Sequence, residues 1–287
     1  AELFKPLYDQ LHQYLLQQPV IQADETTLKV VDADKSTSYM WLYATGADSP
    51  EGKIPDTAIP NIVLYDYHNS RAGQCAVNFL AGYNGYLQVD GYVGYEQTQA
   101  TLVGCWAHAR RKFMEAKKGV GSKGSGKADW ALNHIQKLYR IETQIKDSSA
   151  EQRYTTRQEK CLPLLNQLHT WLNKSAQQVL PKTKLGEAIQ YCLNQWHKLE
   201  RYTLDGQLNI DNNRAERAIK PFVIGRKNWL FSQTATGANA SAILYSIIET
   251  AKANDLNVFE YVMKSLEMLS QPEADIELLL PWLFAKD

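Results

Sequence analysis

The sequence lacks the features that mark several specialised classes of protein. Its 287 residues contain only four cysteines, at positions 75, 105, 161 and 192, and no two of them form a CxxC pair. This spacing excludes a disulfide-rich secreted scaffold and favours reduced thiols in a cytoplasmic protein. Cys105 and His108 have the spacing of two metal ligands, but no second pair completes a structural zinc site.

Long apolar segments and an excess of one charge are also missing. No apolar run approaches the roughly 20 residues that cross a bilayer, and no signal peptide is visible. Lysine plus arginine and aspartate plus glutamate each total 31, so any nucleic-acid-binding surface must come from local clusters of basic residues. The chain starts at Ala1 without methionine, inside a helical pattern. We therefore expect a piece of a longer protein.

The first third of the chain alternates between helical and extended patterns. Leucines at every fourth position predict a helix over residues 3–18. The other predicted elements are strands at 20–31, 37–44 and 61–67, a helix at 71–81, and strands at 86–89 and 101–106. Three consecutive strands predict an antiparallel meander, to which the strand–helix–strand unit adds parallel pairing. The ribonuclease H-like sheet is a known solution of this order.

Helical patterns dominate after Trp106. The predicted elements are a basic helix at 107–118, a Gly/Ser/Lys loop at 119–127, helices broken by Pro181 and Gly186 up to residue 202, a helix at 211–220, an extended stretch at 222–231, and helices at 237–254 and 257–269. We therefore expect a mixed α/β fold, with a ribonuclease H-like mixed sheet flanked by helices and interrupted by an all-helical insertion. The expected segments are an N-terminal helix (1–19), the first part of the core (20–106), the insertion (107–206), the second part of the core (207–270) and a C-terminal tail (271–287).

Three carboxylates lie where they could converge on metal ions. Asp24 lies inside the first predicted strand, Asp90 ends a strand, and Glu216 lies in the early turns of a predicted helix. Cleavage of a phosphodiester by two metal ions needs hard oxygen ligands of this kind, which usually come from distant parts of a chain.

Each of these acids also has a structural interpretation. Asp24 fits a charge at a strand edge with Glu25 as its solvent-facing neighbour, and Asp90 fits an ordinary turn residue. Glu216 has the favourable i,i+4 spacing to pair with Lys220. Spacing alone does not separate the three from other acids of the chain, such as Asp66 and Asp211.

The amino-acid sequences of five longer segments are more specific than the spacing of these acids. They are ADETTLKV, LQVDGYVGY, GCWAHARRKF, DNNRAERAIKPFVIGRKNWLF and ILYSIIETAKAN. Together they resemble the transposases of the insertion-sequence-66 family, which are DDE-type enzymes with a ribonuclease H-like catalytic domain. The resemblance runs from the first helix to the terminal LLLPW and so covers nearly the whole chain. Full-length members also carry an N-terminal region with DNA-binding and oligomerisation elements.

The resemblance implies a site and a reaction. The acids of the DET, DGY and AER segments correspond to Asp24, Asp90 and Glu216, as catalytic residues and as ligands of two Mg²⁺ (or Mn²⁺) ions. Activated water would cleave a phosphodiester at the end of a mobile element, and the freed 3′-OH would attack target DNA. The implied partners are double-stranded DNA, as transposon ends and target, further copies of the chain on that DNA, and accessory proteins of the element. The implied location is the bacterial cytoplasm, at the nucleoid during action, with no membrane.

Basic residues gather in two stretches that flank these acids. The expected DNA-binding residues are His108, Arg110, Arg111, Lys112, Asn212, Asn213, Arg217, Arg226 and Lys227. Such side chains contact phosphates and position DNA without reading its sequence. The structural alternative for the arginines and lysines is that they lie on solvent-exposed helix faces. For His108 the alternative is a structural histidine, and for the two asparagines it is shaping of the helix start.

Three other residues are weaker candidates. Trp229 and Phe231 could stack on an extruded base, but core packing is the favoured interpretation. Arg71 is a further candidate for a phosphate contact.

Two functions other than transposition fit the same residues. One is a ribonuclease H-like nuclease that cuts without joining, because fold alone does not distinguish the two activities. The other is a catalytically silent DNA-binding or regulatory derivative of a transposase. The long helical insertion before Glu216 favours the transposase over a minimal nuclease. The presence of all three acids argues against a derivative that has lost its catalytic residues.

Overall fold

The computed structural model describes residues 1–33, 35, 37–46, 59–118 and 126–284. The chain divides into two compact units. The sheet unit comprises residues 1–87, 92–101 and 213–287, and the helical unit comprises residues 88–91 and 102–212. The five predicted segment boundaries are not the boundaries of these units and stay predictions.

Five strands form one mixed sheet in the order β3-β2-β1-β4-β5. They are β1 (Val20–Leu28), β2 (Ser38–Ala44), β3 (Val63–His68), β4 (Tyr86–Gln88) and β5 (Thr101–Val103). The first three are antiparallel, in a register that places Asp24 opposite Leu42 and Leu42 opposite Tyr65. The predicted mixed α/β fold is therefore confirmed, with strands shorter than the extended patterns of the sequence.

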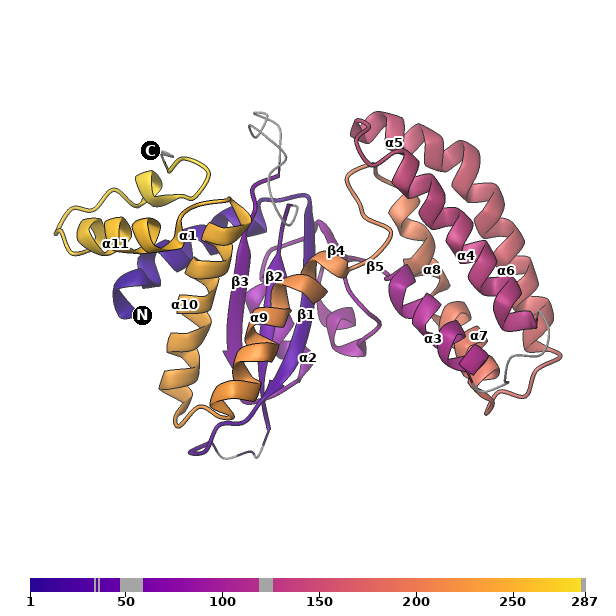
Figure 1. Cartoon of the computed structure of the whole chain (residues 1–287), viewed down its shortest axis with the longest axis horizontal. Coiled ribbons are helices and arrows are strands. Elements are labelled where there is room, and N and C mark those ends of the chain that lie inside the picture. The colour runs from indigo at the N-terminus through magenta and orange to yellow at the C-terminus, as the bar shows by residue number, and fades with distance from the viewer. Residues whose placement is uncertain (34, 36, 47–58, 119–125, 285–287) are drawn as a thin grey trace. The chain divides into compact units, whose positions relative to one another are not determined.

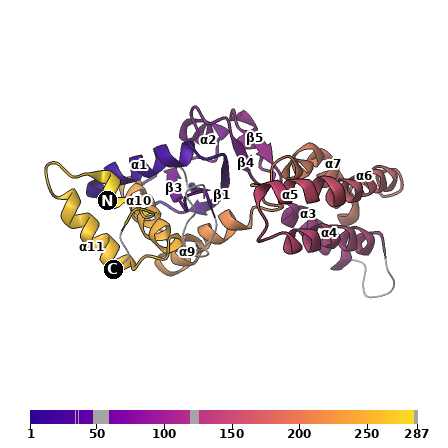
Figure 2. The same cartoon turned by 90° about the horizontal axis from the view of Figure 1, so that it is seen from above.

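Helices α9 (Asn213–Trp229) and α10 (Ala235–Ala253) cover one face of this sheet, as Figures 1 and 2 show. Alternate residues of β1, β2 and β3 face these helices and form a core with apolar side chains such as Ile219 and Phe222. The helix α10 is also bonded to the backbone of β3, because Ser246 Oγ accepts from the Tyr65 amide at 2.8 Å. The two helices are thereby held on the sheet.

The opposite face is covered by α1 (Lys5–Leu16), α2 (Gly73–Phe79) and the 3₁₀ helix η2 (Val93–Gln97). Aromatic rings fill this layer: Tyr43 stacks on Phe79 at 3.9 Å, and Trp41 meets Tyr95 edge-on at 5.6 Å. The remaining elements of the sheet unit are η1 (Glu2–Phe4), α11 (Val258–Leu269) and η5 (Ile276–Leu279). The C-terminal segment packs against α1, since Trp282 lies edge-on to Tyr14.

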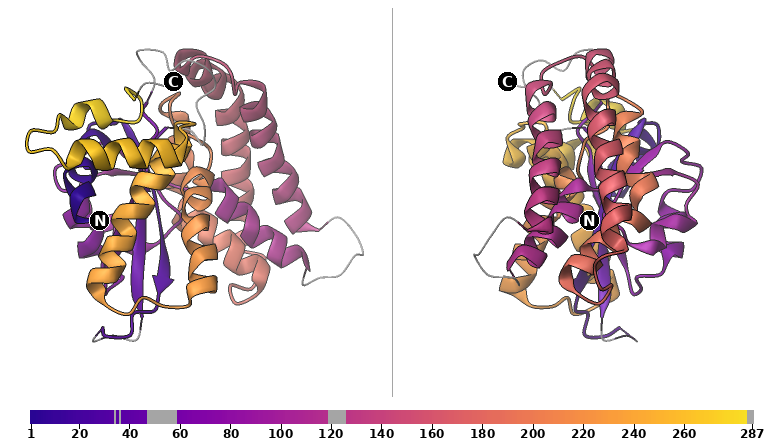
Figure 3. Two further views of the ribbon diagram at one scale, coloured as in Figure 1. Left: turned by 60° about the vertical axis from the view of Figure 1, so that its left-hand side comes forward. Right: turned by 90° about the vertical axis from the view of Figure 1, so that its right-hand side faces the viewer.

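After β5, the described residues of the helical unit form helices and no strand. They are α3 (Trp106–Lys118), α4 (Lys127–Gln144), α5 (Ala150–Thr156), a π-helical turn η3 (Arg157–Cys161), α6 (Leu162–Ala176), α7 (Lys184–Asn194), α8 (Trp196–Leu199) and η4 (Glu200–Thr203). Figure 3 shows α3, α4, α6 and α7 as a bundle. Buried leucines and alanines line the inner faces. Most of the predicted loop 119–127 lies outside the described residues.

Two local predictions were wrong. Residues 222–231 are not extended, because α9 continues through Pro221 to Trp229. Ala215, Ala218, Ile219 and Phe222 are all buried, and this helical spacing continues across the apolar run that suggested a strand. Gly186 does not break a helix either: it lies in the first turn of α7, where its amide donates to Thr183 Oγ1 at 3.1 Å.

Among the described residues, no helix is long and apolar enough to span a membrane.

The buried His134 on α4 predicts a dependence of stability on pH. Burial lowers the pKa of its imidazole below the usual 6.5, and Lys137 acts in the same direction. Unfolding raises the pKa again, so the unfolded chain binds the proton more tightly and stability falls as pH drops below about 6.5. We expect the urea midpoint to decrease on acidification through this range. In His134→Gln this component of the decrease should be absent, whereas an unchanged pH profile in that variant would contradict the assignment.

Candidate functional site

Asp24 lies on the face of β1 that α9 covers. Side chains on a strand alternate between faces, so Gln22 and Asp24 share a face. Gln22 Oε1 accepts from the Ala215 amide at 3.4 Å, and Ala215 directly precedes Glu216. Asp24 is partly exposed, and its Oδ1 accepts from the Glu25 amide at 2.9 Å. Within the sheet unit, strand pairing and this contact therefore place two of the predicted acids in one layer.

Glu216 lies in the first turn of α9 and is partly buried. An acidic side chain in the first helical turn interacts favourably with the positive end of the helix dipole. Lys220, one turn further on, is exposed. The buried residues around Glu216 are Arg214, Ala215 and Ala218, so the helix is packed on both sides of the predicted ligand.

Glu25 lies on the other face of β1 and is not solvent-facing, which corrects the sequence interpretation. Its side chain is only 3% exposed and forms an ion pair with Arg71. The Tyr95 hydroxyl donates to Glu25 Oε2 at 2.7 Å. Burial, and then the Glu25 charge, raise the pKa of that hydroxyl. The guanidinium of Arg71 also lies 4.0 Å from the centre of the Tyr92 ring, so Arg71 has a structural role in this layer.

Asp90 follows β4 and belongs to the helical unit. Its Oδ1 accepts from the Gly91 amide at 2.6 Å, and its carbonyl accepts from the Tyr191 hydroxyl at 3.0 Å. A Cβ atom at Gly91 would come within 3.2 Å of that hydroxyl, so glycine lets Tyr191 approach closely. Burial raises the pKa of Tyr191, and negative charge at Cys105 and Asp90 adds to the effect. Sequence reasoning missed Tyr191, which lies about a hundred positions from Asp90 in no recognisable motif.

The segment before α9 is held by two other residues of the helical unit. The Tyr139 hydroxyl donates to Asp211 Oδ2 at 2.9 Å, and the amide of Asn212 donates to Cys105 Sγ at 3.3 Å. Asn212 is buried and Asn213 is partly exposed. The DNN motif is therefore held by a side-chain contact of Asp211 and a backbone contact of Asn212. This supports the structural alternative for Asn212 without removing the functional one.

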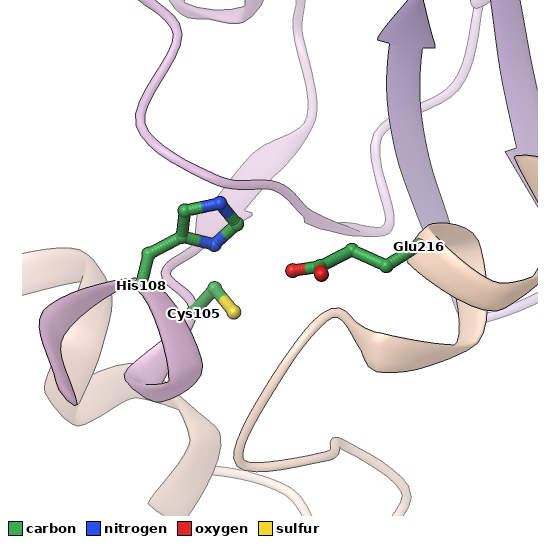
Figure 4. Close-up of side chains that lie close together, drawn as sticks. All are labelled: Cys105, His108 and Glu216. Carbon is green, nitrogen blue, oxygen red and sulfur yellow. The ribbon is translucent and has the colours of Figure 1, made fainter. Parts of the chain in front are cut away.

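Cys105 lies directly before α3 and His108 lies in the first turn of that helix, and Figure 4 shows both side chains. Within the helical unit, the sulfur of Cys105 and a ring nitrogen of His108 lie within 4.8 Å of each other. Sulfur and imidazole ligands suit zinc and other softer ions, whereas carboxylates suit Mg²⁺ and Mn²⁺. Two residues do not complete a structural zinc site, and the chemistry of the three acids fits a hard divalent ion.

The predicted DNA-binding cations are mostly at the surface. Arg110, Arg111, Lys112, Arg217 and Lys227 are exposed. Arg226 is partly buried and is bonded to β1, where it donates to the carbonyl and hydroxyl oxygens of Thr27.

The two aromatic candidates after Glu216 differ in burial. Trp229 packs edge-on to Phe222 at 5.4 Å, which fits core packing. Phe231 is 43% exposed.

The chain is similar to uncharacterized proteins of Sinorhizobium fredii (strain NBRC 101917 / NGR234). It is 34% identical to protein y4qI over 92% of this chain and 51% of that protein. It is 33% identical to y4hP over 96% of this chain and 53% of that protein. It is also 33% identical to y4jD, over 99% of this chain and 57% of that protein. The chain thus spans about half the length of the curated relatives it matches. No solved structure matches it.

Two family models match successive parts of the chain. The model described as "Transposase IS66 family" matches residues 1–240. The model described as "IS66 C-terminal element" matches residues 246–282. Together they cover nearly all of the sequence, including the segments around the three acids. The chain therefore belongs to the IS66 family of transposases.

Proposed function

We propose that this chain carries the catalytic region of a DNA transposase, with Asp24, Asp90 and Glu216 as ligands of two Mg²⁺ or Mn²⁺ ions. Membership of the transposase family suggests divalent-metal use and implies DNA binding. The observation that carries the proposal is the contact between Gln22 and Ala215, which brings the strand of Asp24 and the helix of Glu216 together. The strand order β3-β2-β1-β4-β5 supports a ribonuclease H-like sheet beneath them.

In this proposal the residues of the chain orient the DNA and hold the metal ligands. The bound ions would lower the pKa of water and stabilise charge on the attacking and leaving oxygens. Asp24 and Asp90 each accept a hydrogen bond from the next backbone amide, which restricts the rotamers of these carboxylates. The exposed cations of α3 and α9 would hold the phosphates of the transposon end and the target. Water and then a 3′-OH act as nucleophiles, so no covalent bond to the protein forms.

A strand-transfer assay with a pre-cut transposon end tests this proposal. The DNA would carry the end of the element with a free 3′-OH, and the chain would be incubated with target plasmid and Mg²⁺. We expect joined products that require the metal. Cleavage of uncut ends without joining would support the nuclease instead. The absence of both activities, together with retained DNA binding, would support the silent derivative.

The wider assembly is part of the same proposal. We propose that copies of the chain act together on paired DNA ends, with accessory proteins of the element, in the bacterial cytoplasm at the nucleoid. A sedimentation experiment with and without end DNA would measure the number of chains in each complex.

A further inference from the structure

A pocket of about 280 Å³ lies in the sheet unit between the start of β3, the first turns of α9 and the end of α10. Its lining is Val63, Arg214, Arg217, Ala218, Glu249, Lys252 and Ala253. Three of these seven side chains are cations and one is an acid, so the pocket has an excess of positive charge. None of the cations except Arg217 belongs to the DNA-binding set predicted from the sequence.

The side chain of Arg214 is a buried part of the pocket lining. It is only 6% exposed, and its Nη2 donates to the Thr45 carbonyl at 3.3 Å. This hydrogen bond restrains the guanidinium. A guanidinium has five N–H donors in a rigid fork that matches two oxygens of a phosphate. Burial lowers the local dielectric and so strengthens the attraction to an anion.

The cations Arg217 and Lys252 lie on two different helices. Arg217 is exposed on α9, and Lys252 lies in the last turn of α10. Lys252 Nζ lies 2.7 Å from Glu249 Oε1, whose side chain is only 12% exposed. Glu249 is therefore the internal acid with which an external anion would compete for Lys252.

We propose that this pocket binds one phosphate group of the DNA backbone, with Arg214 as its fixed donor and with Arg217 and Lys252 closing over the phosphate. This inference rests on the proposed function for its ligand, because a transposase brings DNA to the helix that carries Glu216. Glu249 holds Lys252 in place before binding and sets the affinity by repelling the phosphate. The pocket positions DNA and reads no sequence.

The test measures binding of a fluorescent 30-base-pair duplex to the full chain at several KCl concentrations. Loss of one charge-assisted contact should weaken binding of Lys252→Ala roughly tenfold. It should also reduce the slope of log affinity against log salt by about 0.9. The Glu249→Gln variant should bind several-fold more tightly, because the repelling charge is gone. Lys182→Ala, which removes an exposed lysine of the helical unit, is the control and should bind like the parent chain.

Two outcomes would overturn the inference. One is binding by Lys252→Ala and Glu249→Gln equal to that of the parent chain. The other is equal weakening in both, which would mean that the Lys252–Glu249 pair only stabilises the fold; melting curves of both variants identify that case. Titration with inorganic phosphate alone gives an independent arm. Phosphate that binds without displacing DNA, at matched ionic strength, would show that the pocket takes the free anion and not the backbone.

The same variants separate this inference from the proposed function. If Asp24→Asn abolishes strand transfer while the pocket variants bind DNA normally, the pocket inference fails alone. If the pocket variants shift DNA affinity as expected but the parent chain shows no metal-dependent joining, the proposed function fails alone. If the parent chain does not bind DNA, both fail.

Discussion

Replacing Asp24, Asp90 or Glu216 by its amide is expected to lower strand transfer by roughly 10³-fold. An amide keeps the shape of the side chain but removes the charge that a hard divalent ion requires. Metal ions supply several kcal/mol of charge stabilisation in the transition state, and each 1.36 kcal/mol changes the rate about tenfold. The measurement is the rate of joining of a pre-cut end in Mg²⁺, with each variant compared with the parent chain.

The matched control for these three variants is Asp66→Asn on the neighbouring strand β3. Asp66 is also partly buried, but it lies on the opposite face from the α9 layer and contacts His68 at 2.6 Å. Its replacement should leave the rate of joining within a few-fold of the parent rate. Equal losses in Asp66→Asn and Asp24→Asn would point to a general effect on the fold. Full activity in any one of the three amide variants would remove that acid from the proposed site.

Replacing Arg157 by alanine is expected to lower the free energy of unfolding by about 3–5 kcal/mol, the usual cost of breaking a buried ion pair by removing one of its members. Arg157 is fully buried, and two of its nitrogens bond to Glu142, at 2.9 and 2.7 Å. The same guanidinium donates to the carbonyls of Tyr202, Asp205 and Leu208, each at 2.8 Å. These bonds satisfy backbone groups that the short helices after α7 leave unpaired.

Urea unfolding of Arg157→Ala measures this effect, and Lys160→Ala is its control. Lys160 lies in the same π-helical turn but is exposed, so its removal should change stability by less than about 0.5 kcal/mol. Arg157→Lys should be nearly as destabilised as Arg157→Ala, because a lysine cannot bond to a carboxylate and three carbonyls in this planar arrangement. A loss below about 1 kcal/mol in Arg157→Ala would show that this network does not hold the segment.

The elements that could be predicted from the sequence are those whose burial is one-sided. In α1, Leu7, Leu11 and Leu15 are all buried, which is the four-residue spacing that predicted the helix. The three antiparallel strands were found because turn residues separate them. The prediction of an extended stretch over 222–231 was wrong for a physical reason. Phe222 continues the buried face of helix α9, while the apolar residues beside it suggested a strand.

Contacts between residues far apart in the sequence could not be predicted. Nothing in a single sequence indicates that Tyr191 donates to the carbonyl of Asp90, or that Tyr139 holds Asp211. The structural interpretation of Asp24 as a strand-edge charge placed Glu25 in solvent. Its burial depends on Arg71 and Tyr95, which approach it from other elements. The three acids themselves came from the resemblance of the surrounding segments, since their spacing alone did not distinguish them.

The most direct test of the account is anomalous diffraction from crystals of the chain grown with transposon-end DNA and Mn²⁺. We expect two manganese peaks, about 3.5–4 Å apart, coordinated by carboxylate oxygens of Asp24, Asp90 and Glu216. Manganese bound elsewhere, with none of these three carboxylates coordinated, would contradict it.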